Sequence, residues 1–253
     1  MDKMLHLSVS PHTHCGRSTS SIMLDVIIAL LPATIAGVVI FGLNALLVVA
    51  VCVAACVGFE YLFNLIAKKE QTIGDYSAIV TGLLLGLNLP ATTPIWQCVI
   101  GALFAIVVVK CLFGGLGYNF VNPAITARVL MLVSFASVAA PAFPAGVDAT
   151  AGATPLVQLA NGESVDLLTL LLGNHGGAVG ETCAIALILG FLYLRARDVI
   201  SWEIPVSFIG SVFVFSFLME GDAMKALALT LSGGLLLGAI FMATDYVTSP
   251  TTP

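Results

Sequence analysis

A threonine in a turn of small residues is the first candidate for chemistry in this sequence. The stretch Asp148-Ala-Thr-Ala-Gly-Ala-Thr154-Pro places the Thr154 hydroxyl beside alanine and glycine, with no bulky neighbour to block an enzyme that attaches a group there. The same residues also suit an ordinary loop. The residues alone therefore leave both interpretations open.

Ionisable residues within apolar stretches form the second group of candidates. They lie in or at the ends of such stretches and comprise Asp25, Glu60, Asp75, Arg128, Glu181 and Asp245. Charges inside a membrane are costly and often mark function. Asp75 precedes an apolar run and is expected to accept backbone N–H bonds at a helix start. Asp25, Glu60 and Asp245 are the candidates for an ion path, while Glu60 and Arg128 each require a partner or water.

A glycine-rich polar stretch, Gly114-Gly-Leu-Gly-Tyr-Asn-Phe-Val-Asn-Pro123, separates two apolar segments. Glycines let a backbone or a ligand approach closely. Phosphate-binding motifs of the Rossmann or P-loop type need a strand before a helix, and that context is missing here. The stretch is therefore only a weak phosphate signal.

Metal-binding patterns are weak. Six cysteines are present without a CxxC pair: Cys15, Cys52, Cys56, Cys98, Cys111 and Cys183. Cys52 and Cys56 lie one helical turn apart in an apolar run, which favours helix packing. His12 and His14 lack further ligands at zinc-like spacing. We expect no metal site and assign no catalytic residue.

The apolar composition indicates that membrane-spanning helices position these residues. Hydrophobic residues make up 59% of the 253 residues and charged residues 9%, against about a quarter charged in soluble domains. Such a chain suits a lipid-facing surface and predicts an all-α polytopic membrane protein. The few scattered basic residues and the net charge of −5 argue against nucleic-acid binding.

About eight apolar segments approach the length of a membrane span. They cover roughly 22–42, 44–66, 76–90, 95–113, 119–140, 178–194, 202–218 and 226–243, with the third short and ending at Pro90. Lys and Arg favour cytoplasmic loops. A cytoplasmic N-terminus places seven of the nine basic residues at cytoplasmic ends: Lys3, Arg17, Lys68, Lys69, Lys110, Arg195 and Arg197.

The apolar segments suggest four regions and a repeat. Residues 1–21 form a cytoplasmic segment, 22–140 a first helical repeat, 141–177 an outer-face loop that includes Thr154, and 178–253 a second repeat. Gly82-Leu-Leu-Leu-Gly86 before Pro90-Ala-Thr-Thr-Pro94 resembles Gly234-Leu-Leu-Leu-Gly238 before Pro250-Thr-Thr-Pro253. Interrupted apolar segments in corresponding places are typical of duplicated transporter folds. Chance similarity in Leu/Gly-rich sequence is the alternative. On the repeat interpretation, we expect further helices beyond residue 253.

The order and spacing of several motifs resemble the D subunit of the Rnf electron-transport complex, which is related to the B subunit of the sodium-pumping NADH:quinone oxidoreductase. The resemblance begins at Ser10-Pro11-His12 and includes residues 23–33, 75–90 and 114–124, and it closes with Ala243-Thr-Asp-Tyr-Val-Thr-Ser-Pro-Thr-Thr-Pro253. It thus covers nearly the whole chain. It implies a fold of urea-transporter-like inverted repeats with about ten spans.

The resemblance also implies a cofactor. Members of the family carry FMN covalently through a phosphoester to a threonine, which corresponds to Thr154. Asp148, Gly152 and Ala153 match the attachment signature, whereas residue 151 is Ala where relatives often have Ser or Thr. Thr150 is the alternative acceptor. Asn119, Asn122 and Arg128 are further candidate flavin contacts, and relatives with bound riboflavin extend the expectation to a second, non-covalent flavin.

The implied function is electron relay coupled to Na⁺ or H⁺ transport in a bacterial cytoplasmic (inner) membrane. The A, B, C, E and G subunits of such a complex would be the partners, with ferredoxin and NAD acting through them. The flavin supplies the redox chemistry and the protein tunes it. Two alternatives remain at this point: a cofactor-free scaffold subunit, and a solute channel of the urea or ammonium type. Flavin fluorescence would exclude the channel, and a loss of electron transfer on substitution of Thr154 would exclude the scaffold.

Overall fold

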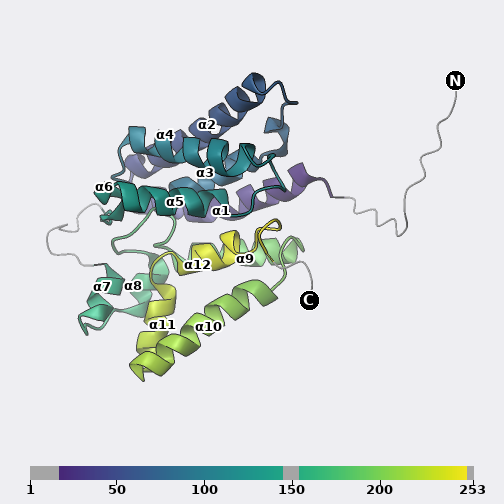
Figure 1. Ribbon diagram of the computed structural model, residues 1–253. Helices are drawn as coiled ribbons and strands as arrows, with labels where there is room; N and C mark the ends of the chain where they lie inside the picture. Colours follow the sequence, from purple (N-terminus) through teal and green to yellow (C-terminus); the bar gives the residue numbers. More distant parts are fainter. Residues whose placement is uncertain (1–16, 145–153, 250–253) are drawn as a thin grey trace, which may run out of the picture.

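The computed structural model describes residues 17–144 and 154–249, and these residues fold into helices (Figure 1). Within the described ranges there is no β-strand, only an isolated antiparallel bridge between Ala142 and Gly177. The helices of the first half are α1 (Thr19–Phe41), α2 (Leu43–Ile66), η1 (Ile73–Asp75), α3 (Ser77–Leu87), α4 (Ile95–Leu103), η2 (Phe104–Cys111), α5 (Pro123–Ser134) and α6 (Ala136–Ala139). The second half contains α7 (Pro155–Ala160), α8 (Leu167–Leu172), α9 (Ala184–Ala196), α10 (Glu203–Glu220), α11 (Ala223–Leu231), α12 (Leu235–Leu237) and η3 (Gly238–Met242).

Three helices are long and apolar enough to cross a membrane: α1, α2 and α10. A fourth span results if α11 and the α12–η3 pair are counted together, although they are bent by 66°. The remaining apolar helices α3, α4–η2, α5 and α9 are shorter. The chain is thus an all-α, multi-pass membrane protein. The expectation of about eight near-full-length spans is only partly confirmed, because half of the expected segments form shorter helices.

The helices form two groups that meet along α1 and α9 (Figure 1). Helices α1 to α6 lie together, with α2 packed closely on α3 and α4, while α10 packs on α11 in the second group. The loops before η1 and after η2 lie at one end of the first group, and α6 lies at the other. Residues 17–20 and 243–249 lie at the same end as those loops, on the side opposite α7.

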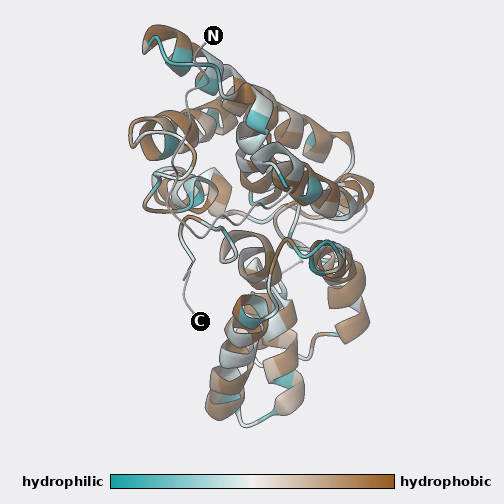
Figure 2. Cartoon of the chain, turned by 90° about the vertical axis from the view of Figure 1, so that its right-hand side faces the viewer, coloured by the Kyte–Doolittle hydropathy of each residue, from teal (hydrophilic) through white to brown (hydrophobic). Residues whose placement is uncertain are grey.

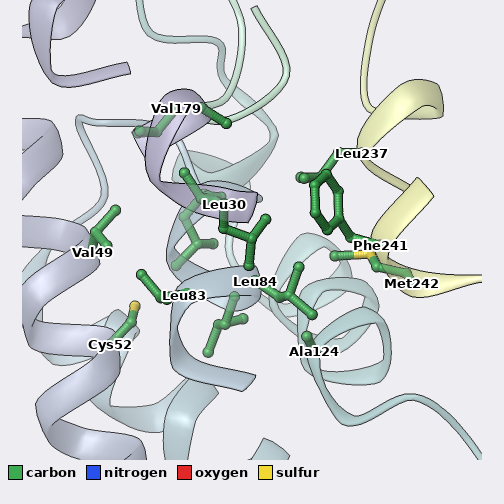
Figure 3. Close-up of a cluster of buried hydrophobic side chains, with 14 of the residues drawn as sticks. Leu30, Val49, Cys52, Leu83, Leu84, Ala124, Val179, Leu237, Phe241 and Met242 are labelled. Carbon is green, nitrogen blue, oxygen red and sulfur yellow. The ribbon is translucent and has the colours of Figure 1, made fainter. Parts of the chain in front are cut away.

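Apolar side chains from both groups form the core (Figure 3). Leu30 of α1 and Leu84 of α3 lie between Cys52 of α2 and Phe241 of η3, and these side chains belong to one buried cluster. The expectation that Cys52 and Cys56 pack within a helix interface is confirmed, since both side chains are buried.

The outward surface is apolar as well. Most of the ribbon is brown in Figure 2, and large apolar side chains such as Val39, Leu43 and Leu218 are more than two-thirds exposed. Helix α10 buries only Pro205. In water such a surface would be unfavourable, but it matches the hydrocarbon of a bilayer.

Local capping determines where the helices near the polar sites begin. Asn122 accepts hydrogen bonds from the backbone N–H groups of Ala124 and Ile125, and Pro123 occupies the first turn of α5. Asp75 accepts the Ser77 N–H at 2.8 Å, so its expected role at the start of α3 is confirmed. Both helix starts lie at the same end of the first group, which brings Ser77 and the Asn119 region together.

Helices α2 and α3 approach so closely that Gly82 has no room for a side chain. A Cβ atom there would lie 2.6 Å from the Val53 Cα atom and 3.0 Å from the Cys52 carbonyl oxygen. Both are backbone atoms, so relief would require the helices to separate. Small residues at such contacts allow close packing of membrane helices.

Substitution of Gly82 by valine is therefore expected to destabilise the protein by about 1–3 kcal/mol through overpacking. The matched control is Gly58→Val on α2, where an added Cβ would meet no heavy atom within 4 Å. Thermal unfolding in detergent should show a lower Tm for Gly82→Val and an unchanged Tm for Gly58→Val. Equal Tm values for the two variants would contradict the close α2–α3 contact.

Candidate functional site

Thr154 lies at the N-terminus of α7 and lines a cavity of about 310 Å³, here called the Thr154 cavity. Pro155 occupies the first turn of α7, where its missing N–H costs nothing. The Thr154 side chain accepts no hydrogen bond from the helix start, and within the described ranges no other partner contacts its hydroxyl. The hydroxyl is thus available for a covalent bond.

Arg128 lines the same cavity, so the structure brings together two of the residues singled out from the sequence. Its Nη1 donates to the Val138 carbonyl oxygen at 3.1 Å, which leaves other guanidinium N–H groups unused by that bond. Glu181, another of the ionisable candidates from the sequence but one given no specific role there, also lines the cavity, and its Oε1 accepts the Ala178 N–H at 2.9 Å. A guanidinium suits a phosphate group because its N–H donors match two phosphate oxygens.

A second cavity, of about 200 Å³, lies at the opposite end of α3 and α5 and is here called the Asn119 cavity. Asn119, Asn122 and Asp245 all line it, together with apolar side chains of α1, α3 and η3 such as Val26 and Phe241. Apolar walls with a few polar groups are typical of small-molecule sites. The structure thus brings the two asparagines and one candidate ion-path carboxylate to one place.

Asp245 follows η3, outside the helical segments, and burial raises the pKa of its carboxyl above the ordinary range. Hydrogen bonds from the Val247 backbone, and from the side chains of Thr248 and Asn119, oppose this increase. The carboxyl group therefore takes up a proton at a higher pH than an exposed aspartate does.

Glu60 belongs to a buried hydrogen-bond network beside the Asn119 cavity. Its Oε2 accepts from the Lys110 Nζ at 2.8 Å, and its Oε1 accepts from the Thr72 hydroxyl at 2.6 Å. Lys110 also donates to the Ser77 hydroxyl at 2.6 Å, which in turn donates to Asp75 at 2.5 Å. The partner that the sequence analysis required for Glu60 is therefore Lys110.

Lys110 lies in the last turn of η2, at the end of its apolar segment as expected, but its side chain is buried. It is only 2% exposed and lines the Asn119 cavity. Its ammonium turns inward because the buried Glu60 carboxylate offers a closer partner than the headgroup region. The signal that could have revealed this residue is its place in an apolar helical run, Val107-Val-Val-Lys110-Cys-Leu, opposite an equally isolated Glu60.

Asp25, the third candidate for the ion path, lies apart from both cavities. It is 4% exposed and forms an ion pair with Arg197 at 3.2 Å, while the Tyr193 hydroxyl donates to it at 3.1 Å. These contacts join α1 to the end of α9. The carboxylate is therefore engaged in packing rather than facing a cavity.

Several candidates from the sequence lie outside the described residues: Asp148, Thr150, Gly152, Ala153, His12, His14 and Cys15. In residues 17–144 and 154–249, no group of three His, Cys, Asp or Glu side chains could hold a metal ion. The described part of the attachment region is thus Thr154 itself.

Comparison with known families identifies the chain. The model of the NQR2, RnfD, RnfE family matches residues 6–253. The chain belongs to this family. The resemblance seen in the sequence motifs is therefore confirmed over nearly the whole chain.

Individual members of the NQR2, RnfD, RnfE family are also similar to the chain. It is 44% identical to the D subunit of the Na⁺-translocating ferredoxin:NAD⁺ oxidoreductase complex of Acetobacterium woodii, over 98% of this chain and 79% of that protein. It is 38% identical to the D subunit of the proton-translocating ferredoxin:NAD⁺ oxidoreductase complex of Clostridium ljungdahlii, over 97% of this chain and 80% of that protein. A third relative, the D subunit of the ion-translocating oxidoreductase complex of Vibrio atlanticus, is 35% identical over 97% of this chain and 84% of that protein.

Proposed function

We propose that this chain is the membrane subunit of an ion-translocating ferredoxin:NAD oxidoreductase complex, that it carries FMN on Thr154, and that it relays electrons in a chain coupled to Na⁺ or H⁺ transport. The observation that carries the flavin assignment is the shared cavity of an unbonded threonine hydroxyl and the Arg128 guanidinium. The names of the relatives, both D subunits of ferredoxin:NAD⁺ oxidoreductase complexes, support membership of such a complex and the reaction proposed for it.

The Thr154 cavity fits the proposed group. Its volume of about 310 Å³ falls within the range of roughly 300–1,000 Å³ for small-molecule sites. Arg128 would hold the phosphate of the ester, and Glu181 on the same wall would keep the guanidinium oriented through its opposite charge. When bound, FMN supplies the electron-transfer chemistry, while the protein sets its position and surroundings.

We extend the proposal to a second, non-covalent flavin such as riboflavin at the Asn119 cavity, whose volume of about 200 Å³ lies below that range and so would hold only part of the molecule. Its walls are mainly apolar, and the Asn119 and Asn122 amides and the Lys110 ammonium offer the few polar groups that would orient a ring. Asn122 uses its amide oxygen to cap α5, so its amide nitrogen is the part left for a ligand.

The proposed location is a bacterial cytoplasmic membrane with the N-terminus inside and Thr154 outside. The two cavities lie at opposite ends of α3 and α5. The Asn119 cavity would then lie near the cytoplasmic face and the Thr154 cavity near the outer face. The partners would be the other subunits of the complex, through which ferredoxin and NAD act.

A peptide mass spectrum and a labelling experiment test this function. The denatured chain is expected to fluoresce as a flavoprotein, and the peptide that contains Thr154 is expected to carry FMN less one water molecule. A membrane-impermeant reagent added to whole spheroplasts should reach a single cysteine introduced at Gln158 beside this site but not one introduced at Gln71. An unmodified Thr154 peptide from the active complex, or the reverse labelling pattern, would overturn the proposal.

A further inference from the structure

Lys68 and Lys69, at the end of α2, are cations that lack an oxygen partner among the described residues. Of the nine basic residues in the chain, all but Lys3 lie in the described ranges. Six of these pair with a carboxylate or a backbone carbonyl oxygen: Arg17, Lys110, Arg128, Arg195, Arg197 and Lys225. The side chains of Lys68 and Lys69 pair with neither within those ranges, and both residues are exposed, as is the neighbouring Glu70. Two adjacent ammonium groups are thus available to an anion.

The backbone conformation of Lys68 is one that a lysine rarely adopts. Lys68 follows Ala67, the C-cap of α2, and lies in the left-handed region with a φ of 53°. Glycine is usual at this position, because a Cβ atom makes the left-handed conformation unfavourable. The turn is well bonded, since the Lys69 N–H donates to the Asn64 carbonyl oxygen at 2.9 Å. Backbone strain of this kind clusters at functional positions. It points to a use for the Lys68 side chain that glycine would not serve.

The last turns of α2 present an apolar face directly before these lysines. Leu62, Leu65 and Ile66 are exposed, Ile66 to 80%, and their spacing places them on one side of the helix. Because α2 is long and apolar enough to cross a membrane, lysines at its end extend to the headgroups. The Lys69 Nζ also lies 5.6 Å from the centre of the Phe63 ring, which holds this ammonium beside the helix. An apolar face followed by two ammonium groups matches the order of acyl chain and headgroup in a phospholipid.

We propose that Lys68 and Lys69 bind the headgroup of one anionic phospholipid, whose acyl chains lie against the exposed face of Leu62, Leu65 and Ile66. The phosphodiester of the lipid accepts charge-assisted hydrogen bonds from the two ammonium groups. A choline headgroup carries its own cation and gains little from the lysines. The site therefore favours lipids with a net negative charge, such as phosphatidylglycerol, over zwitterionic ones. A lysine close to an anionic membrane surface increases affinity about fivefold.

The bound lipid also holds the turn that follows α2. This turn leads to Thr72, whose hydroxyl donates to Glu60 at 2.6 Å and accepts from the Asn64 amide at 3.0 Å. Because the lysines have this arrangement only in the folded turn, the lipid stabilises the folded chain. The site needs no flavin, and its residues line neither the Thr154 cavity nor the Asn119 cavity. Failure of this inference would therefore leave the proposed function intact.

Native mass spectrometry of the purified full chain in detergent measures this binding. The delipidated chain is titrated with phosphatidylglycerol and, separately, with phosphatidylcholine of the same acyl chains. The variants are Lys68→Gln/Lys69→Gln and Lys68→Gly/Lys69→Gln. Glycine suits the left-handed turn, so the second variant provides a folded chain if the first is unstable. Lys225→Gln is the matched control, because it removes an exposed lysine that already pairs with Glu220.

Both double variants are expected to lower the affinity for phosphatidylglycerol about 25-fold, since each lysine contributes about fivefold, and to leave the affinity for phosphatidylcholine unchanged. Lys225→Gln should bind both lipids as the unmodified chain does. An unchanged affinity for phosphatidylglycerol in both double variants, or an equal loss of affinity for the two lipids, would overturn the inference. A carbodiimide, which couples amines to adjacent carboxylates, tests the intact complex. A crosslink from Lys68 or Lys69 to another subunit would assign this surface to a protein contact and overturn the lipid site.

Discussion

Replacement of Thr154 by valine is expected to remove all covalently bound flavin from the chain. Valine keeps the shape of threonine but lacks the hydroxyl oxygen that would form the phosphoester. The hydroxyl makes no hydrogen bond to the start of α7, so the change should alter folding stability by less than about 0.5 kcal/mol, as for most substitutions without a lost contact. Flavin fluorescence of the denatured chain should fall to background.

Two further variants make this result specific. Thr154→Ser retains a hydroxyl at the same position and is expected to keep covalent flavin, whereas Thr150→Val should leave the amount unchanged. Fluorescence that persists in Thr154→Val but disappears in Thr150→Val would move the attachment to the alternative acceptor. Flavin fluorescence that persists in both variants would show that neither threonine carries the flavin. The cofactor-free scaffold would then be the better account of this subunit.

The membrane class and the general course of the helices could be predicted from the sequence because composition and apolar segment length act locally. The lengths of individual helices could not. Asn88 ends α3 after 11 residues, and the segment expected at 226–243 divides into α11 and α12–η3 with a 66° bend. Such breaks depend on how neighbouring helices satisfy the freed backbone groups, which a single apolar segment does not reveal.

The grouping of the site residues was only partly predictable. The sequence marked Thr154 and Arg128, which meet in one cavity, and Asn119 and Asp245, which meet in another. The role of Lys110 was missed because positive charges near apolar segments usually reach the headgroups. Its buried position results from Glu60, 50 residues earlier in the chain, and from the packing of η2 against α2.

The Lys110–Glu60 pair is expected to have the largest effect on stability of any ion pair among the described residues. Both side chains are no more than 3% exposed, so Lys110→Met would leave the Glu60 carboxylate buried without its cation. Removal of one partner of such a pair costs about 3–5 kcal/mol, whereas replacement of both partners by neutral groups is often tolerated. The double variant Lys110→Met/Glu60→Gln should therefore recover most of the stability lost in Lys110→Met.

Thermal or denaturant unfolding of the purified complex in detergent measures this difference. The matched control is Lys225→Met, whose pair with Glu220 is 3.9 Å long and whose side chains are 38% and 42% exposed. An exposed pair contributes at most about 1 kcal/mol, so this variant should unfold nearly as the unmodified protein does. If Lys110→Met were as mild as Lys225→Met, Glu60 would have to be neutral or solvated in the folded protein. The description of Lys110 and Glu60 as a charged, buried ion pair would then be wrong. A large loss in Lys110→Met that the double variant recovers is the result that only a charged, desolvated pair produces.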